Sequence, residues 1–147
     1  MKTSSFSLPF IIVIMTVGSL LYGHCEIPCG IYDDEARFNL LEEHVTTIEK
    51  SMQQITKMEN EEQTVSNQYV RWIMNKEEHA TDFQHIVTQY FMTQRIKPDT
   101  ESYADKLALL HKMLIASMKC KQTTDLRYVE ELRDLIEKFH VLYSDHH

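Results

Sequence analysis

The sequence predicts an all-α fold, an antiparallel four-helix bundle preceded by an N-terminal metal-binding hook. The 147-residue chain contains only three Gly and three Pro, so few positions interrupt a helix. Four segments carry apolar residues at alternating steps of three and four, and no segment shows the alternation of a half-buried strand. Short polar stretches separate the four segments, which favours an up-and-down bundle.

The first two helices are predicted from their apolar seams. The first seam comprises Phe38, Leu41, Val45, Ile48, Met52 and Ile55, and we place the following turn at Met58–Glu62. The second seam comprises Val65, Tyr69, Trp72, His79, Phe83, Ile86 and Tyr90. It holds Lys76 and His79 at positions that are normally apolar. We expect these two residues where the helix meets a subunit interface or the hook; equally, His79 is expected as a satisfied core histidine.

The last two helices follow a proline. Pro98 ends the second helix, and Asp99 or Thr100 is expected to cap the third. The third seam comprises Tyr103, Leu107, Leu110 and Leu114. The polar stretch Lys119 to Thr124 separates it from the fourth, with Thr123 or Thr124 as the expected cap. The fourth seam comprises Val129, Leu132, Ile136, Phe139 and Tyr143.

Residues 1–23 resemble a secretory signal peptide. Lys2 provides a basic start, and a mainly apolar run from Leu8 to Leu21 is rather short for a membrane span. Gly23 suits a cleavage site, although Leu21 is bulky for one. We expect removal of 1–23 by a leader-processing peptidase, no stable membrane anchor afterwards, and a secreted or secretory-route location; a retained anchor is the alternative. Residues 24–147 would then form one domain, with the hook at 24–32 and the bundle at 34–144.

Charge and cysteine content exclude some classes of protein. Without residues 1–23 the chain keeps 14 basic and 22 acidic residues, a formal net charge of −8. Such a balance argues against nucleic acid as a partner. Three cysteines are an odd number, which argues against a full disulfide framework. Cys120, alone near a helix end, is expected to be a buried, inert thiol.

The chemistry of the chain is concentrated in His24-Cys25-Glu26-Ile27-Pro28-Cys29-Gly30-Ile31-Tyr32. Cleavage before His24 would offer an α-amine, an imidazole, a backbone amide and a thiolate within two residues, and Cys29 would add a second thiolate. Two nitrogen and two sulfur donors in a plane suit Ni(II) or Cu(II), whereas zinc prefers a tetrahedral site.

The run His24-Cys25-x-x-Pro28-Cys29-Gly30-x-Tyr32-Asp33 resembles the hook of nickel superoxide dismutases. The resemblance implies a four-helix bundle, one nickel ion per subunit, and dismutation of superoxide to oxygen and hydrogen peroxide by Ni(III)/Ni(II) cycling. It implies that His24, Cys25 and Cys29 bind the metal, through the His24 amine and imidazole, the Cys25 amide and both thiolates. Tyr32 is implied as the gate at the open face. A homohexamer is also implied.

This chain departs from the family where a glutamate commonly hydrogen-bonds the hook histidine. Asn39 lies near that register, with Glu35, Glu42 and Glu43 around it. Superoxide is an anion, so basic residues near the site would have to offset the negative net charge. The candidates are Arg71, Lys76, Arg95 and Lys97.

Two other functions fit the same residues. A secreted helical-bundle binding protein would hold Cys25 and Cys29 in a structural disulfide, which an oxidising compartment favours. A nickel or copper carrier would use the same ligands without turnover. The Met-rich seams and His146-His147 are interpreted as core filler and a tail rather than as metal sites.

Overall fold

The structure, a computed structural model, describes residues 34–62 and 64–144. Its elements are α2 (Asp34–Asn60), α3 (Asn67–His85), the π-helix η2 (Ile86–Arg95), α4 (Tyr103–Gln122) and α5 (Arg127–Ser144). The predicted leader and the hook residues His24, Cys25, Cys29 and Tyr32 lie outside the described residues. All elements within the described ranges are helices, so the all-α prediction is confirmed.

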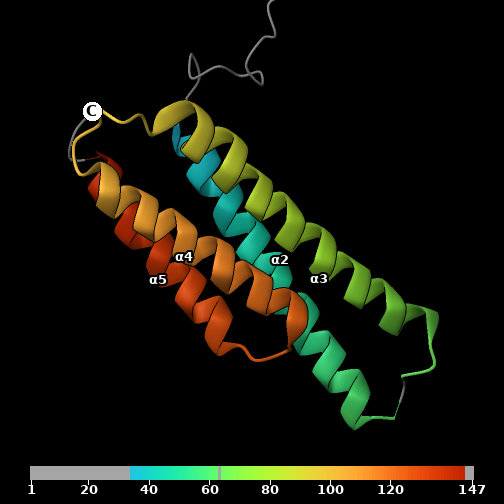
Figure 1. The fold of residues 1–147 in the computed structure, drawn as a ribbon. Helices are drawn as coiled ribbons and strands as arrows, with labels where there is room; N and C mark the ends of the chain where they lie inside the picture. Colours follow the sequence, from blue (N-terminus) through green and yellow to red (C-terminus); the bar gives the residue numbers. More distant parts are fainter. Residues whose placement is uncertain (1–33, 63, 145–147) are drawn as a thin grey trace, which may run out of the picture.

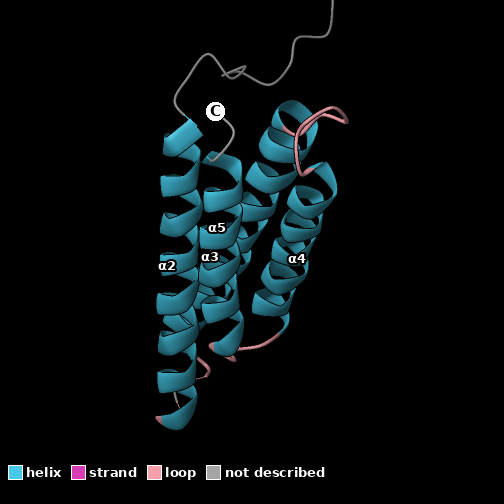
Figure 2. Ribbon diagram, turned by 90° about the vertical axis from the view of Figure 1, so that its left-hand side faces the viewer, coloured by secondary structure: helices cyan, strands magenta, loops and turns pink. Residues whose placement is uncertain are grey.

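The helices form an up-and-down bundle (Figures 1 and 2). Helix α2 packs against α3 and α5, and α4 packs against α3, η2 and α5. The start of α2 therefore lies at the same end as the end of η2 and the end of α5 (Figure 1). Among the described residues, no helix is both long and apolar enough to cross a membrane.

The seams predicted for the first and last helices are confirmed. All six predicted seam residues of α2 are buried, and so are all five of α5. These faces meet in one continuous core to which α3, η2 and α4 also contribute. The alternation of three and four steps identified these faces correctly because the buried positions of both helices are nearly all apolar.

The first turn lies later in the chain than predicted. Helix α2 continues to Asn60 and buries Met58, so the turn cannot begin there. The prediction for Val65 was wrong, since it precedes α3 and is fully exposed. The physical reason is the cap: the Ser66 hydroxyl accepts the backbone N–H of Tyr69 at 3.1 Å, so the helix starts after Val65.

The predictions for α4 and for the start of α5 also need correction. The fully buried face of α4 comprises Lys106, Leu110, Met113, Ala116, Ser117 and Cys120. Tyr103, Leu107 and Leu114 only flank it. Ser102, rather than Asp99 or Thr100, precedes the helix, and α4 extends through Gln122. Before α5, the Asp125 carboxylate accepts the backbone N–H of Arg127 at 3.1 Å, whereas Thr123 only binds the N–H of Asp125.

Lys76 is buried and satisfied within the bundle. Its Nζ donates to the backbone carbonyl of Cys120 at 2.9 Å and to that of Lys121, and it lies 3.1 Å from a Glu77 carboxylate oxygen. The last carbonyls of an α-helix have no partner within the helix, and a cation there is favoured by the helix dipole. Lys76 thus joins α3 to the C-terminal end of α4.

Replacing Lys76 by methionine should lower the free energy of unfolding by about 1.5–3 kcal/mol, because hydrogen bonds from a charged donor to buried carbonyls are lost. Urea unfolding of the variant would measure this. The matched control is Lys112→Met on the exposed side of α4, which should shift stability by about 0.5 kcal/mol or less. Equal effects of the two substitutions would contradict this role of Lys76.

Candidate functional site

The predicted hook joins the bundle at the first turn of α2, where an acidic residue is held by three neighbours. Asp34 Oδ2 accepts hydrogen bonds from Arg95 Nη2 at 2.6 Å and from Tyr143 Oη at 2.6 Å. Asp34 Oδ1 accepts a hydrogen bond from Tyr90 Oη. Arg95 Nε in turn donates to Tyr143 Oη at 2.9 Å, which closes the network. We call these four residues, Asp34, Tyr90, Arg95 and Tyr143, the Asp34 cluster.

The Asp34 cluster is largely withdrawn from solvent and is ionised. The side chains of Asp34 and Arg95 are 19% and 23% exposed. Burial alone would raise the pKa of Asp34, but the hydrogen bonds from Tyr143, Tyr90 and Arg95 outweigh it and hold that pKa below its usual value. Burial, together with the bond to Asp34, raises the pKa of Tyr90 to about 12. Both groups therefore stay in their present protonation states near neutral pH.

A layer of aromatic rings packs against the Asp34 cluster. The ring of Phe139 lies 5.1 Å from that of Phe91, 5.7 Å from that of Phe38 and 5.6 Å from that of Tyr143. Phe38 also stacks on His140 at 4.1 Å. Aromatic pairs at these separations add to the stabilisation from area burial. The rings of Tyr90 and Tyr143 thus pack against buried apolar rings, while their hydroxyls bond to Asp34.

The structure separates the four basic residues proposed to guide superoxide. Lys76 Nζ is already hydrogen-bonded to a carbonyl at the end of α4. Arg71 is on the first part of α3, toward the end of the bundle opposite the start of α2. Arg95 lies at the end where α2 begins and is paired with Asp34; Lys97 follows two residues later and is exposed. Sequence reasoning missed Arg37, whose guanidinium lies 5.0 Å from the centre of the Tyr90 ring.

Two of the three glutamates near Asn39 have partners on α5. A carboxylate oxygen of Glu35 lies 2.9 Å from His140 Nε2, and Glu42 pairs with Arg133 Nη1 at 3.0 Å. Asn39 is exposed. These contacts join the first half of α2 to α5.

A histidine pair links α2 to α3. His44 Nδ1 lies 2.9 Å from His79 Nδ1, so one ring donates and the other accepts. Burial, and then the charge on His79, lowers the pKa of His44, although Asp82 and Glu43 act in the opposite direction. His79 is hydrogen-bonded as predicted, but it is half-buried at the edge of the core rather than within it.

Acidification should therefore destabilise the bundle through His44. Unfolded His44 has an ordinary pKa near 6.5 and takes up a proton more readily than the folded residue, so stability falls as the pH drops below about 6.5. Unfolding free energies at about pH 7.5 and 5.5 should differ less in His44→Gln than in the parent. His111→Gln, an exposed histidine on α4, should retain the parent's dependence. A parent-like pH dependence in His44→Gln would contradict the assignment.

Cys120 matches its prediction as an inert thiol. It is fully buried and free, and burial raises its pKa to about 12. Within residues 34–62 and 64–144, no group of three or more His, Cys, Asp or Glu side chains is arranged to hold a metal ion.

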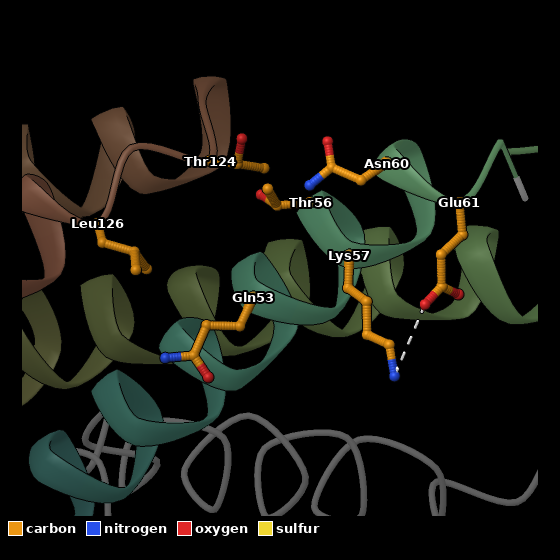
Figure 3. Close-up of a pocket in the computed structure, with 7 residues that line it drawn as sticks. All are labelled: Gln53, Thr56, Lys57, Asn60, Glu61, Thr124 and Leu126. Atoms are coloured by element: carbon orange, nitrogen blue, oxygen red, sulfur yellow. Dashed lines mark ion pairs between the residues drawn. The ribbon is translucent and has the colours of Figure 1, made fainter.

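Two open grooves lie on the surface of the bundle. One, of about 460 Å³, is formed by the last part of α2 together with Thr124 and Leu126, at the end opposite Asp34 (Figure 3). The other, of about 500 Å³, lies between α2 and α5. Its charged lining consists of four carboxylates, from Glu35, Glu42, Asp134 and Glu137, against the single arginine Arg133, which does not suit an anionic substrate.

Comparison with known proteins gives one match that covers most of the chain. The family model described as nickel-containing superoxide dismutase matches residues 20–147, a range that includes the motif at 24–33 and all described helices. Neither the curated proteins nor the solved structures contain a match.

Proposed function

Since this chain belongs to the nickel-containing superoxide dismutase family, we propose that its hook, residues 24–32, is the nickel site of the enzyme. The protein is a nickel-dependent superoxide dismutase, an oxidoreductase that acts on superoxide. The observation that carries the proposal is the position of the motif. His24, Cys25 and Cys29 fall inside the matched range and directly before the first helix of the bundle.

The donor set of the hook fits nickel. With a free amine at His24, the residues offer two nitrogen and two sulfur donors for a square plane, and this set suits Ni(II). The His24 imidazole would add a further nitrogen donor, and Tyr32, three residues after Cys29, would order small molecules at the open face. Bound nickel would supply a Ni(III)/Ni(II) couple for the dismutation of two superoxide ions and two protons to oxygen and hydrogen peroxide.

The remaining assignments follow from the same proposal. One nickel ion is bound per subunit, and the subunits form a homohexamer. A peptidase removes residues 1–23 and frees the His24 amine, and the apolar character of that segment supports a secreted or secretory-route location. Prompt metal binding would protect Cys25 and Cys29 from oxidation along this route.

The intact mass of the protein from its native host, with metal analysis of the same sample, tests the proposal. The expected result is a chain that starts at His24 and carries about one nickel ion. A chain that retains residues before His24, or a metal-free chain lighter by two hydrogens, would overturn the ligand assignment and favour a Cys25–Cys29 disulfide. Nickel binding without acceleration of superoxide decay above that of free nickel would indicate a carrier.

A further inference from the structure

We propose that the Asp34 cluster is a clamp that positions the metal hook, with Arg95 and Tyr143 as positioning residues. The inference deepens the function proposed above and rests on it. Asp34 is two residues after Tyr32 in the chain. Whatever fixes Asp34 therefore fixes the point from which the hook extends.

Three side chains from two other helices hold Asp34 in place. Asp34 belongs to α2, Tyr90 and Arg95 to η2, and Tyr143 to the last turn of α5. Their hydrogen bonds join residues that are 56, 61 and 109 positions apart in the sequence. Ionic hydrogen bonds of this kind are shorter and stronger than neutral ones, and a closed network holds its members in one arrangement. The first turn of α2, which would otherwise fray, is thereby tied to two other helices.

The π-helix explains how η2 supplies two members of the cluster. In an α-helix, residues five positions apart point about 140° apart around the axis, so Tyr90 and Arg95 would leave on different faces. In η2 the backbone bonds join residues five apart, as in the bond from the Ile96 N–H to the Phe91 carbonyl at 2.9 Å. Residues five apart then lie along one row of the helix. The uncommon helix form places a hydroxyl and a guanidinium on the same carboxylate, and such segments are frequent at functional sites.

The chain provides a matched control for this role. Arg133 of α5 also bridges to α2, through Glu42 at 3.0 Å and Glu49 at 2.8 Å. Its partners lie two and four helical turns after Asp34. Arg133 therefore joins the same helix to the bundle without holding its first turn. If the arginines only stabilise the bundle, variants of Arg95 and Arg133 should change amide exchange and nickel release alike. If Arg95 positions the hook, only its variants should change them.

The first arm of the test uses metal-free protein and measures amide hydrogen exchange at residues 38–41, whose N–H groups bond to the carbonyls of the first turn of α2. Arg95→Met should accelerate exchange there about tenfold, and Tyr143→Phe should do so to a smaller degree, with helix content unchanged. Arg133→Met should leave exchange at 38–41 as in the parent. Parent-like exchange in both Arg95→Met and Tyr143→Phe would overturn the clamp.

The second arm uses nickel-loaded protein and follows transfer of nickel to an excess of chelator, together with the nickel–thiolate absorption. Arg95→Met should release nickel about tenfold faster than the parent, in the range found when supporting residues around a metal site are removed. Arg95→Lys should recover part of the loss, and Arg133→Met should match the parent. Equal release rates in Arg95→Met and the parent would refute the positioning role. If the parent itself binds no nickel through the hook, the proposed function fails, while the first arm still decides the clamp.

Discussion

Replacing Cys29 by serine is expected to abolish superoxide dismutation while the four-helix bundle stays folded. The substitution exchanges a thiolate donor for a hydroxyl that stays protonated near neutral pH, so the planar donor set loses one sulfur. Position 29 precedes the helical bundle, which has its own core. Activity should fall to the level of free nickel, and circular dichroism should show unchanged helix content.

The third cysteine provides the control for this experiment. Cys120→Ala removes a thiol that is buried and protonated, so activity per bound nickel should match the parent. If Cys29→Ser retains nickel and activity, the ligand assignment is wrong. If Cys120→Ala loses activity as completely, the effect of Cys29→Ser could not be attributed to the hook.

Truncation of Phe139 to alanine should cause the largest loss of stability, about 3–5 kcal/mol in the free energy of unfolding. Phe139 is fully buried and its ring contacts those of Phe38, Phe91 and Tyr143. Its removal leaves a cavity that three rigid rings cannot fill by small shifts. Urea or thermal unfolding of the metal-free protein would measure the loss.

Val141→Ala, on the same helix, is the matched control for Phe139→Ala. Val141 is 58% exposed, so its truncation should change stability by about 0.5 kcal/mol or less. A loss below about 1 kcal/mol in Phe139→Ala would mean that the aromatic layer is not a rigid support for the Asp34 cluster.

The faces of α2 and α5 could be predicted from sequence, whereas that of α4 could not. In α2 and α5 the buried positions are apolar almost throughout, so the pattern and the core coincide. In α4 the buried face includes Lys106, Ser117 and Cys120, and the predicted seam followed the larger leucines beside it. Ser117 is accommodated because its hydroxyl donates to the Ala80 carbonyl at 3.0 Å. Such partners come from another helix and leave no mark on the local pattern.

The same contrast applies to the candidate site. The hook could be predicted from sequence because its proposed ligands lie within six consecutive residues, 24–29. The Asp34 cluster could not, since its members are brought together from distant parts of the chain. Nor does an apolar period of 3.6 residues reveal a change to a π-helix within a continuous helical segment. The spacing of Tyr90 and Arg95 becomes meaningful only once that change is known.

The up-and-down topology has a practical consequence for handling the enzyme on surfaces. Because Tyr143 bonds to Asp34, a tag attached after α5 would sit at the hook end, where added imidazoles would compete for nickel. The turn between α2 and α3 lies at the far end of the 27-residue helix α2, about 40 Å away. Val65 in that turn is fully exposed, which makes it a suitable anchor point. A cysteine or peptide handle placed there would immobilise the protein on an electrode with its redox site facing the solution.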